Sequence, residues 1–127
     1  MTEMGTFRIA IRIAHPTDDA RIVELPDVLV DTGSELTWVP AAILESLGIR
    51  RHQTIRFRQA TGTIVERATG AAIVHAGGAL AADEVVFAEP GDLTLLGARS
   101  LEGLRLGVDP VTKRLVDTGP MTVAAAA

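Results

Sequence analysis

Short stretches in which apolar and polar residues alternate recur along this chain, and turn-forming residues separate one stretch from the next. In residues 7–13, phenylalanine and isoleucine alternate with arginine and alanine, which is the period-two pattern of a half-buried strand. A proline and two aspartates in residues 15–19 then predict a turn, and residues 21–25 predict the returning strand. Further strands are expected at residues 28–30, 37–39, 53–58, 64–65, 71–76, 79–88, 93–96, 106–108 and 114–116.

Two short segments have helical spacing instead. Pro40 suits the first turn of a helix over residues 41–47, which Gly48 would end, and residues 98–104 predict a second short helix. Strands therefore far outnumber helices. The predicted fold class is all-β, a closed barrel or a sandwich with two short helices.

Prolines and glycines indicate where the strands stop or bend. Pro26-Asp27 predicts a break after the second strand, Gly70 predicts a bend or bulge, and Gly77-Gly78 predicts a two-residue hairpin turn. At 127 residues the chain is sized for a single domain spanning residues 1–127. Residues 119–127 are expected as a flexible tail, unless residues 121–127 add a short final strand.

The composition argues against several kinds of function. The chain has no cysteine, which rules out disulfides and cysteine-ligated zinc, and its three histidines are too scattered in sequence to predict a metal site. A net charge of −4 and the scarcity of aromatic residues argue against nucleic-acid binding. No secretory signal or membrane-spanning apolar run is present, so we expect a cytoplasmic protein that does not bind membranes. Arginine outnumbers lysine strongly, which is typical of a GC-rich bacterial genome.

One motif carries candidate chemistry. Residues 28–30 form an apolar run, expected to be buried on both faces, that leads Asp31 into a sharp turn. Gly33 tolerates backbone angles that other residues avoid, and it can offer its N–H to the carboxylate. Ser34 can donate a hydrogen bond that favours the ionised carboxylate, and Thr32 can reach back to the backbone and hold the turn.

The sequence resembles the retropepsin-like aspartic proteases, the single-domain relatives of pepsin. Residues 29–34, which read Leu-Val-Asp-Thr-Gly-Ser, match the aspartate motif of that family. Leu95-Leu96-Gly97, followed by the helix at residues 98–104, matches the apolar strand that packs around the active-site loop. The family's β-hairpin flap over the cleft corresponds to residues 57–65. The resemblance extends from about residue 7 to residue 116.

This resemblance implies an acid-protease half-lobe in which Asp31 is catalytic and neither a metal nor an organic cofactor is needed. The flap tip has no aromatic residue, unlike better-known relatives. The residues implied to support the active-site loop are Thr32, Gly33, Ser34, Leu95, Leu96 and Gly97. The flap residues implied to bind substrate are Gln59, Ala60, Thr61, Gly62 and Thr63.

The aspartate motif occurs a second time near the end of the chain. Residues 115–119 repeat residues 29–33 letter for letter, but only eight residues follow Gly119 and Pro120 stands where the serine would be. The second copy therefore has no flap, no following apolar strand and no helix. We interpret it as a strand end running into a terminal turn, not as the second half of a duplicated active site.

Peptide hydrolysis of this kind needs two carboxylates that share one proton. Since one chain supplies one suitable aspartate, the resemblance predicts a homodimer in which Asp31 meets its symmetry mate on the two-fold axis and acts on a peptide or protein substrate. Residues 7–13 and 114–123 are the candidate interface segments. Trp38 is expected in the core or in the wall of a substrate subsite. Two alternatives stay open: a dimeric peptide-binding module without catalysis, and a monomeric β-barrel in which Asp31 only caps a turn.

Overall fold

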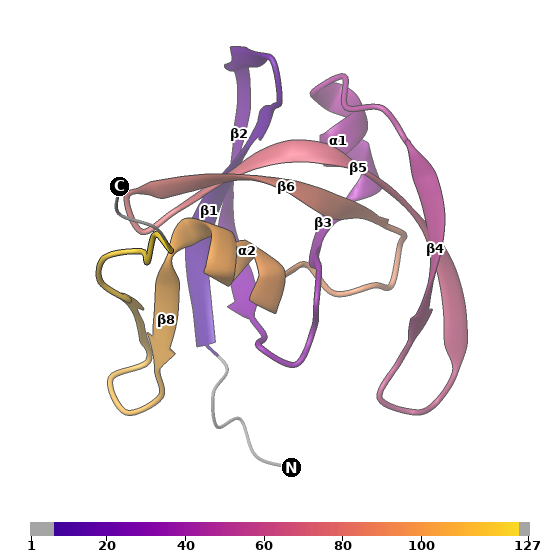
Figure 1. The fold of residues 1–127 in the computed structure, drawn as a ribbon. Helices are drawn as coiled ribbons and strands as arrows, with labels where there is room; N and C mark the ends of the chain where they lie inside the picture. Colours follow the sequence, from indigo (N-terminus) through magenta and orange to yellow (C-terminus); the bar gives the residue numbers. More distant parts are fainter. Residues whose placement is uncertain (1–6, 125–127) are drawn as a thin grey trace.

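The computed structural model describes residues 7–124, which form nine strands and two helices (Figure 1). Alternating apolar residues make one face of most strands suitable for burial. In chain order the elements are β1 (Phe7–His15), β2 (Asp18–Val30), β3 (Thr37–Pro40), α1 (Ala41–Ser46), β4 (Gln53–Arg58), β5 (Ile64–Ala76), β6 (Ala79–Ala88), β7 (Leu95–Leu96), α2 (Ala98–Leu104), β8 (Leu106–Asp109) and β9 (Arg114–Asp117).

Seven strands form one mixed sheet in the order β1-β2-β7-β3-β6-β5-β4. Strand β7 lies parallel to β2, and β3 lies parallel to β6, whereas the other neighbours are antiparallel. Strand β1 also pairs with β5, so the pairings return to their starting strand in a closed circuit, and β4 remains at an edge beside β5. Strands β8 and β9 form a separate two-stranded sheet.

The core is almost entirely aliphatic. The inward-facing side chains of the strands form most of it. The helices add Leu44 from α1 and Leu101 and Leu104 from α2. Close packing of branched side chains from the strands compensates for the scarcity of aromatic residues. The largest fully buried side chains are Phe87, Ile11, Ile13, Leu44, Leu96, Leu104, Val28, Val30, Val39, Val74, Val85 and Val86.

Several local predictions are confirmed. Helix α2 has the predicted bounds, and α1 ends one residue before the predicted position, with Gly48 at φ +77° just beyond it. Gly77 and Gly78 join β5 to β6 with φ of +58° and +81°. Two consecutive positive φ angles are typical of the primed hairpin turn that the glycine pair predicts.

Two predicted interruptions are wrong. Strand β2 continues through Pro26-Asp27, because its pairing with β1 shifts register between Ile9 and Ile11 and this irregularity absorbs the proline. Gly70 lies in regular pairing opposite Val85. It is glycine for another reason, since a Cβ at this position would collide with the carbonyl oxygen of Arg50.

The end of the described chain has no regular structure. Residues 118–124 form neither helix nor strand, so the final strand considered for residues 121–127 is absent as far as residue 124. Residues 125–127 lie outside the described residues. Neither helix within residues 7–124 has the length and apolar character needed to cross a membrane.

Candidate functional site

Asp31 lies directly after β2, beside the short strand β7. These strands run parallel, with Leu29 opposite Leu95 and Val30 opposite Leu96. The backbone N–H of Asp31 extends the ladder by donating to the carbonyl oxygen of Leu96 at 3.0 Å. Because Val30 and Leu96 are fully buried, the core holds both strands, and the half-buried Asp31 emerges from a fixed strand end.

Hydrogen bonds within the loop orient the Asp31 carboxylate. Its Oδ1 accepts from the backbone N–H of Gly33 at 2.9 Å, and the N–H of Ser34 donates to the backbone carbonyl of Asp31 at 3.2 Å. The sequence predicted that the Ser34 hydroxyl donates to the carboxylate, and this prediction is wrong. It donates to the carbonyl oxygen of Leu36 at 2.9 Å and so closes the next part of the loop. Thr32 is exposed.

Gly33 contributes space instead of an unusual backbone angle. Its φ is not among the positive values in the described chain, so this turn does not use the freedom of glycine to adopt them. A Cβ at this position would lie 3.2 Å from Oδ1 of Asp31, closer than most real Cβ contacts. Glycine therefore keeps the side of the carboxylate open while its N–H binds the oxygen.

Helix α2 packs its N-terminal end directly onto the Asp31 loop. The first N–H groups of a helix have no partner within the helix. Here Ala98 donates to the carbonyl oxygen of Ser34 at 2.7 Å, and Arg99 donates to that of Glu35 at 2.9 Å. A Cβ at Gly97 would collide with the backbone of Leu36, so only glycine permits this close approach. The structure thus brings residues 31–34 and 95–97 together.

Three polar residues beneath the loop were missed by sequence reasoning. The Oγ1 of Thr37 accepts from the N–H of Gly97 at 3.0 Å and lies 2.6 Å from Oγ of Ser100, which donates to Asp83 at 2.7 Å. Thr37 and Ser100 are fully buried. In the sequence, the one sign of their role is that polar residues stand at positions that face the core. Their pairing cannot be inferred from local patterns, because the two residues are 63 positions apart in the chain.

The hairpin of β4 and β5 carries the predicted flap residues at its tip. The N–H of Gln59 donates to the carbonyl of Thr63, and the N–H of Gly62 donates to that of Gln59, both at 2.8 Å, with Gly62 at φ +91°. All five predicted flap residues, 59–63, are exposed. In the view of Figure 1 the hairpin projects from the sheet edge formed by β4. Phe57 pairs with Val65 close to the tip, and its ring meets that of Trp38 in β3 edge-on, with centroids 5.1 Å apart.

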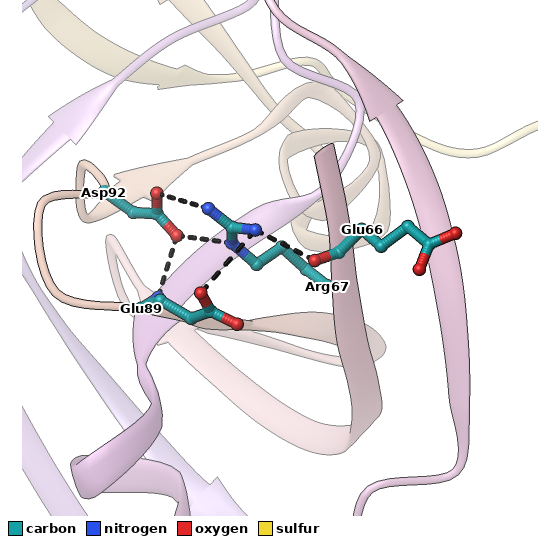
Figure 2. A network of polar contacts seen from close by, with 4 residues as sticks. All are labelled: Glu66, Arg67, Glu89 and Asp92. Atoms are coloured by element: carbon teal, nitrogen blue, oxygen red, sulfur yellow. Dashed lines mark hydrogen bonds and ion pairs between the residues drawn. The ribbon is translucent and has the colours of Figure 1, made fainter. Parts of the chain in front are cut away.

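An ion pair fastens β5 to the loop that leads into β7 (Figure 2). Arg67 donates to both carboxylate oxygens of Asp92, at 2.7 and 3.0 Å, and its side chain also lies 3.7 Å from the carboxylate of Glu89. The hydrogen bond from Arg67 is the main cause that lowers the pKa of Asp92, against the opposing effect of burial. The same contact raises the pKa of Arg67.

The second aspartate motif forms a similar local turn in a different setting. Oδ1 of Asp117 accepts from the N–H of Gly119 at 2.6 Å, at the end of β9. Thr118 donates through its N–H and its hydroxyl to the carbonyl oxygen of Arg105, both at 3.1 Å. Asp117 is exposed and is the last residue of β9, paired with Leu106 of β8, as expected for a strand end running into a turn.

The three histidines belong to different parts of the fold, with His15 at the end of β1, His52 just before β4 and His75 in β5. The Nδ1 of His15 accepts from the N–H of Thr17 at 3.1 Å in the turn between β1 and β2. Within residues 7–124, no three His, Asp or Glu side chains are close enough together to hold a metal ion.

The fold is shared with a viral protease. No protein-family model matches this sequence, and no curated protein matches it either. Among solved structures, the chain is similar to the protease of simian foamy virus (mac), determined in solution, with a TM-score of 0.52 and 22% sequence identity. The match covers 76% of this chain and 92% of the viral chain. The chain thus has a mostly β, retropepsin-like fold with two short helices.

Proposed function

We propose that this protein is an aspartic endopeptidase that acts as a homodimer. The observation that carries the proposal is the way Asp31 is held: its backbone is fixed on β7, and its Oδ1 is bound by the N–H of Gly33. Helix α2 supports the same loop through its first N–H groups. A carboxylate held this firmly on a retropepsin-like fold suits chemistry that depends on orientation.

In the proposed reaction, two Asp31 carboxylates from the two chains share one proton. The ionised carboxylate takes a proton from a water molecule, which attacks the peptide carbonyl, and the protonated carboxyl polarises that carbonyl oxygen. The N–H of Gly33 stabilises negative charge on Oδ1 and keeps the carboxylate in one orientation.

The second carboxylate has to come from another chain. Asp117 has the same neighbours in sequence, but β9 pairs with β8 and not with a strand equivalent to β7. A two-fold contact brings each residue close to its own copy on the axis, so an isologous dimer supplies the second Asp31.

The terminal segments offer strand edges for such a dimer. Within the described residues, β9 pairs with β8 alone, and β1 pairs with β5 only through Arg12–Ala14. The C-terminal segment also exposes apolar side chains, with Val116, Met121 and Val123 at 39%, 73% and 82% exposure. Burying these edges and side chains against a second copy would favour association.

Substrate would bind as an extended peptide under the flaps at residues 59–63. The tip carries small and polar side chains and makes its hydrogen bonds within itself. Such a tip also suits a peptide-binding module without catalysis, which is the second candidate function.

The test is digestion of a peptide library from acidic to neutral pH by the full chain, by Asp31→Asn and by Asp117→Asn. Asp117 sits in the same five-residue motif, so it is a matched control. We expect a bell-shaped pH profile, a loss of about a thousandfold or more in Asp31→Asn, and unchanged activity in Asp117→Asn. Cleavage that survives in Asp31→Asn contradicts the assignment. Peptide binding without cleavage by the unmodified chain supports the peptide-binding module.

A further inference from the structure

A chain of hydrogen bonds continues from the backbone of Asp31 into the core. The N–H of Asp31 donates to the carbonyl oxygen of Leu96 at 3.0 Å. The N–H of that same peptide group belongs to Gly97, and it donates to Oγ1 of Thr37 at 3.0 Å. One peptide group therefore receives the Asp31 loop on one side and is held by a buried hydroxyl on the other.

The chain ends on a carboxylate in β6. The hydroxyl oxygens of Thr37 and Ser100 lie 2.6 Å apart, and Ser100 donates to Oδ2 of Asp83 at 2.7 Å. The other oxygen of Asp83, Oδ1, accepts from the N–H of Glu84 at 2.8 Å. Thr37 and Ser100 are both 0% exposed, so water cannot replace either residue as the hydrogen-bond partner of the other.

The ends of the chain determine the direction of every hydrogen bond in it. A backbone N–H can only donate, and an ionised carboxylate can only accept. Ser100 therefore donates to Asp83 and accepts from Thr37, which in turn accepts from Gly97. All the donors point toward the negative charge, and hydrogen bonds arranged in such a series polarise one another.

We propose that Asp83, acting through Ser100 and Thr37, is a positioning residue for Asp31. Its negative charge sets the direction of the chain and so fixes the peptide group on which the backbone of Asp31 rests. The catalytic consequence rests on the proposed function: a misplacement of about 1 Å can reduce a reaction rate about 100-fold.

Asp83→Asn is the most informative variant because it preserves the shape of the side chain and removes its ability to accept at both ends. If the amide oxygen faces the N–H of Glu84, the amide NH2 donates to Ser100 and reverses the hydroxyls. Thr37 then receives two donors, and its own hydrogen loses its acceptor. If the amide is flipped, its NH2 faces the N–H of Glu84. Either orientation costs one hydrogen bond.

The experiment measures amide hydrogen exchange by NMR at Asp31 and Gly97, together with kcat and KM, in the full chain. Asp19→Asn, an exposed residue near the β1–β2 turn, is the matched control for the same change of charge. For Asp83→Asn we expect exchange about tenfold faster at both amides and kcat lower by about tenfold, with KM within about twofold. Asp19→Asn should match the unmodified chain.

A second pair of variants covers the case in which Asp83→Asn does not fold. Thr37→Ser keeps the hydroxyl and should keep both slow amide exchange and kcat, whereas the isosteric Thr37→Val should lose both. Unchanged exchange at Asp31 and Gly97 in Asp83→Asn, or faster exchange with unchanged kcat, overturns the positioning role. If the unmodified chain shows no cleavage that depends on Asp31, the proposed function fails, and amide exchange alone still decides whether Asp83 positions the loop.

Discussion

The guanidinium of Arg67 donates two hydrogen bonds to the carboxylate of Asp92, and these side chains are only 14% and 10% exposed. The N–H of Glu89 donates to the same carboxylate at 2.7 Å, which closes the loop between β6 and β7 upon itself. Figure 2 shows that the carboxylate of Glu66, although adjacent in sequence, is directed away from this pair. The contact therefore joins β5, which carries the second half of the flap hairpin, to the loop that leads into β7.

This ion pair predicts that the fold loses stability in acid. Arg67 holds the pKa of Asp92 below its ordinary value of 3.8, so the stabilisation is complete above that value and is lost as the pH falls through the lower, folded-state pKa. At pH 7, Asp92→Asn should reduce the free energy of unfolding by about 2 kcal/mol, because it leaves Arg67 without its charged partner. Urea denaturation at neutral pH and well below the ordinary pKa of Asp92 measures both effects, and the difference between variants should shrink in acid.

Glu89 supplies the control for this prediction. Its carboxylate lies 3.7 Å from Arg67 and its side chain is 56% exposed, so water screens the pair. Glu89→Gln should therefore change the free energy of unfolding by no more than about 0.5 kcal/mol. An Asp92→Asn variant as stable as the unmodified chain at neutral pH, or one whose deficit persists undiminished in acid, would show that this contact does not stabilise the fold.

The close approach at Gly97 predicts a strong effect of a single methyl group. In Gly97→Ala, the new Cβ collides with the backbone of Leu36, which cannot move aside as a flexible side chain could. The free energy of unfolding should fall by about 3 kcal/mol or more. Gly107→Ala is the matched control, because its Cβ would meet its nearest neighbour, Thr118, at an ordinary 3.4 Å, and a change within about 1 kcal/mol is expected. Thermal unfolding followed by circular dichroism compares the two, and equal melting temperatures would contradict the packing described for the loop.

Local patterns in the sequence predict most elements of this fold. Alternating side chains give β1 and β4, and the pair Gly77-Gly78 gives the turn between β5 and β6, because both signals act over neighbouring residues. The aspartate motif and the Leu-Leu-Gly segment are also recognisable in the sequence. The structure shows why they belong together, because β2 and β7 pair in parallel and place the two segments side by side.

The features that sequence reasoning missed depend on contacts between distant segments. Pro26 is tolerated in β2 because the partner strand shifts register, and Gly70 is fixed by the passing backbone of Arg50. The sequence does not reveal the roles of Thr37 and Ser100, because their buried hydroxyl groups find hydrogen-bond partners in each other and in Asp83, which are distant along the chain. The turn chemistry assigned to Ser34 was wrong because its hydroxyl meets a carbonyl two residues ahead before it can reach the carboxylate.

In the proposed dimer, two chains share one active site through Asp31, and an experiment that mixes active and inactive chains tests this sharing. Unmodified chain and Asp31→Asn are unfolded together in equal amounts and refolded, so that random pairing makes about one quarter of the dimers fully unmodified. If both carboxylates are required, peptide cleavage per unmodified chain should fall to about half of that measured without the variant. Cleavage per unmodified chain that stays constant in the mixture would mean that each chain works alone, and it would contradict the shared dyad.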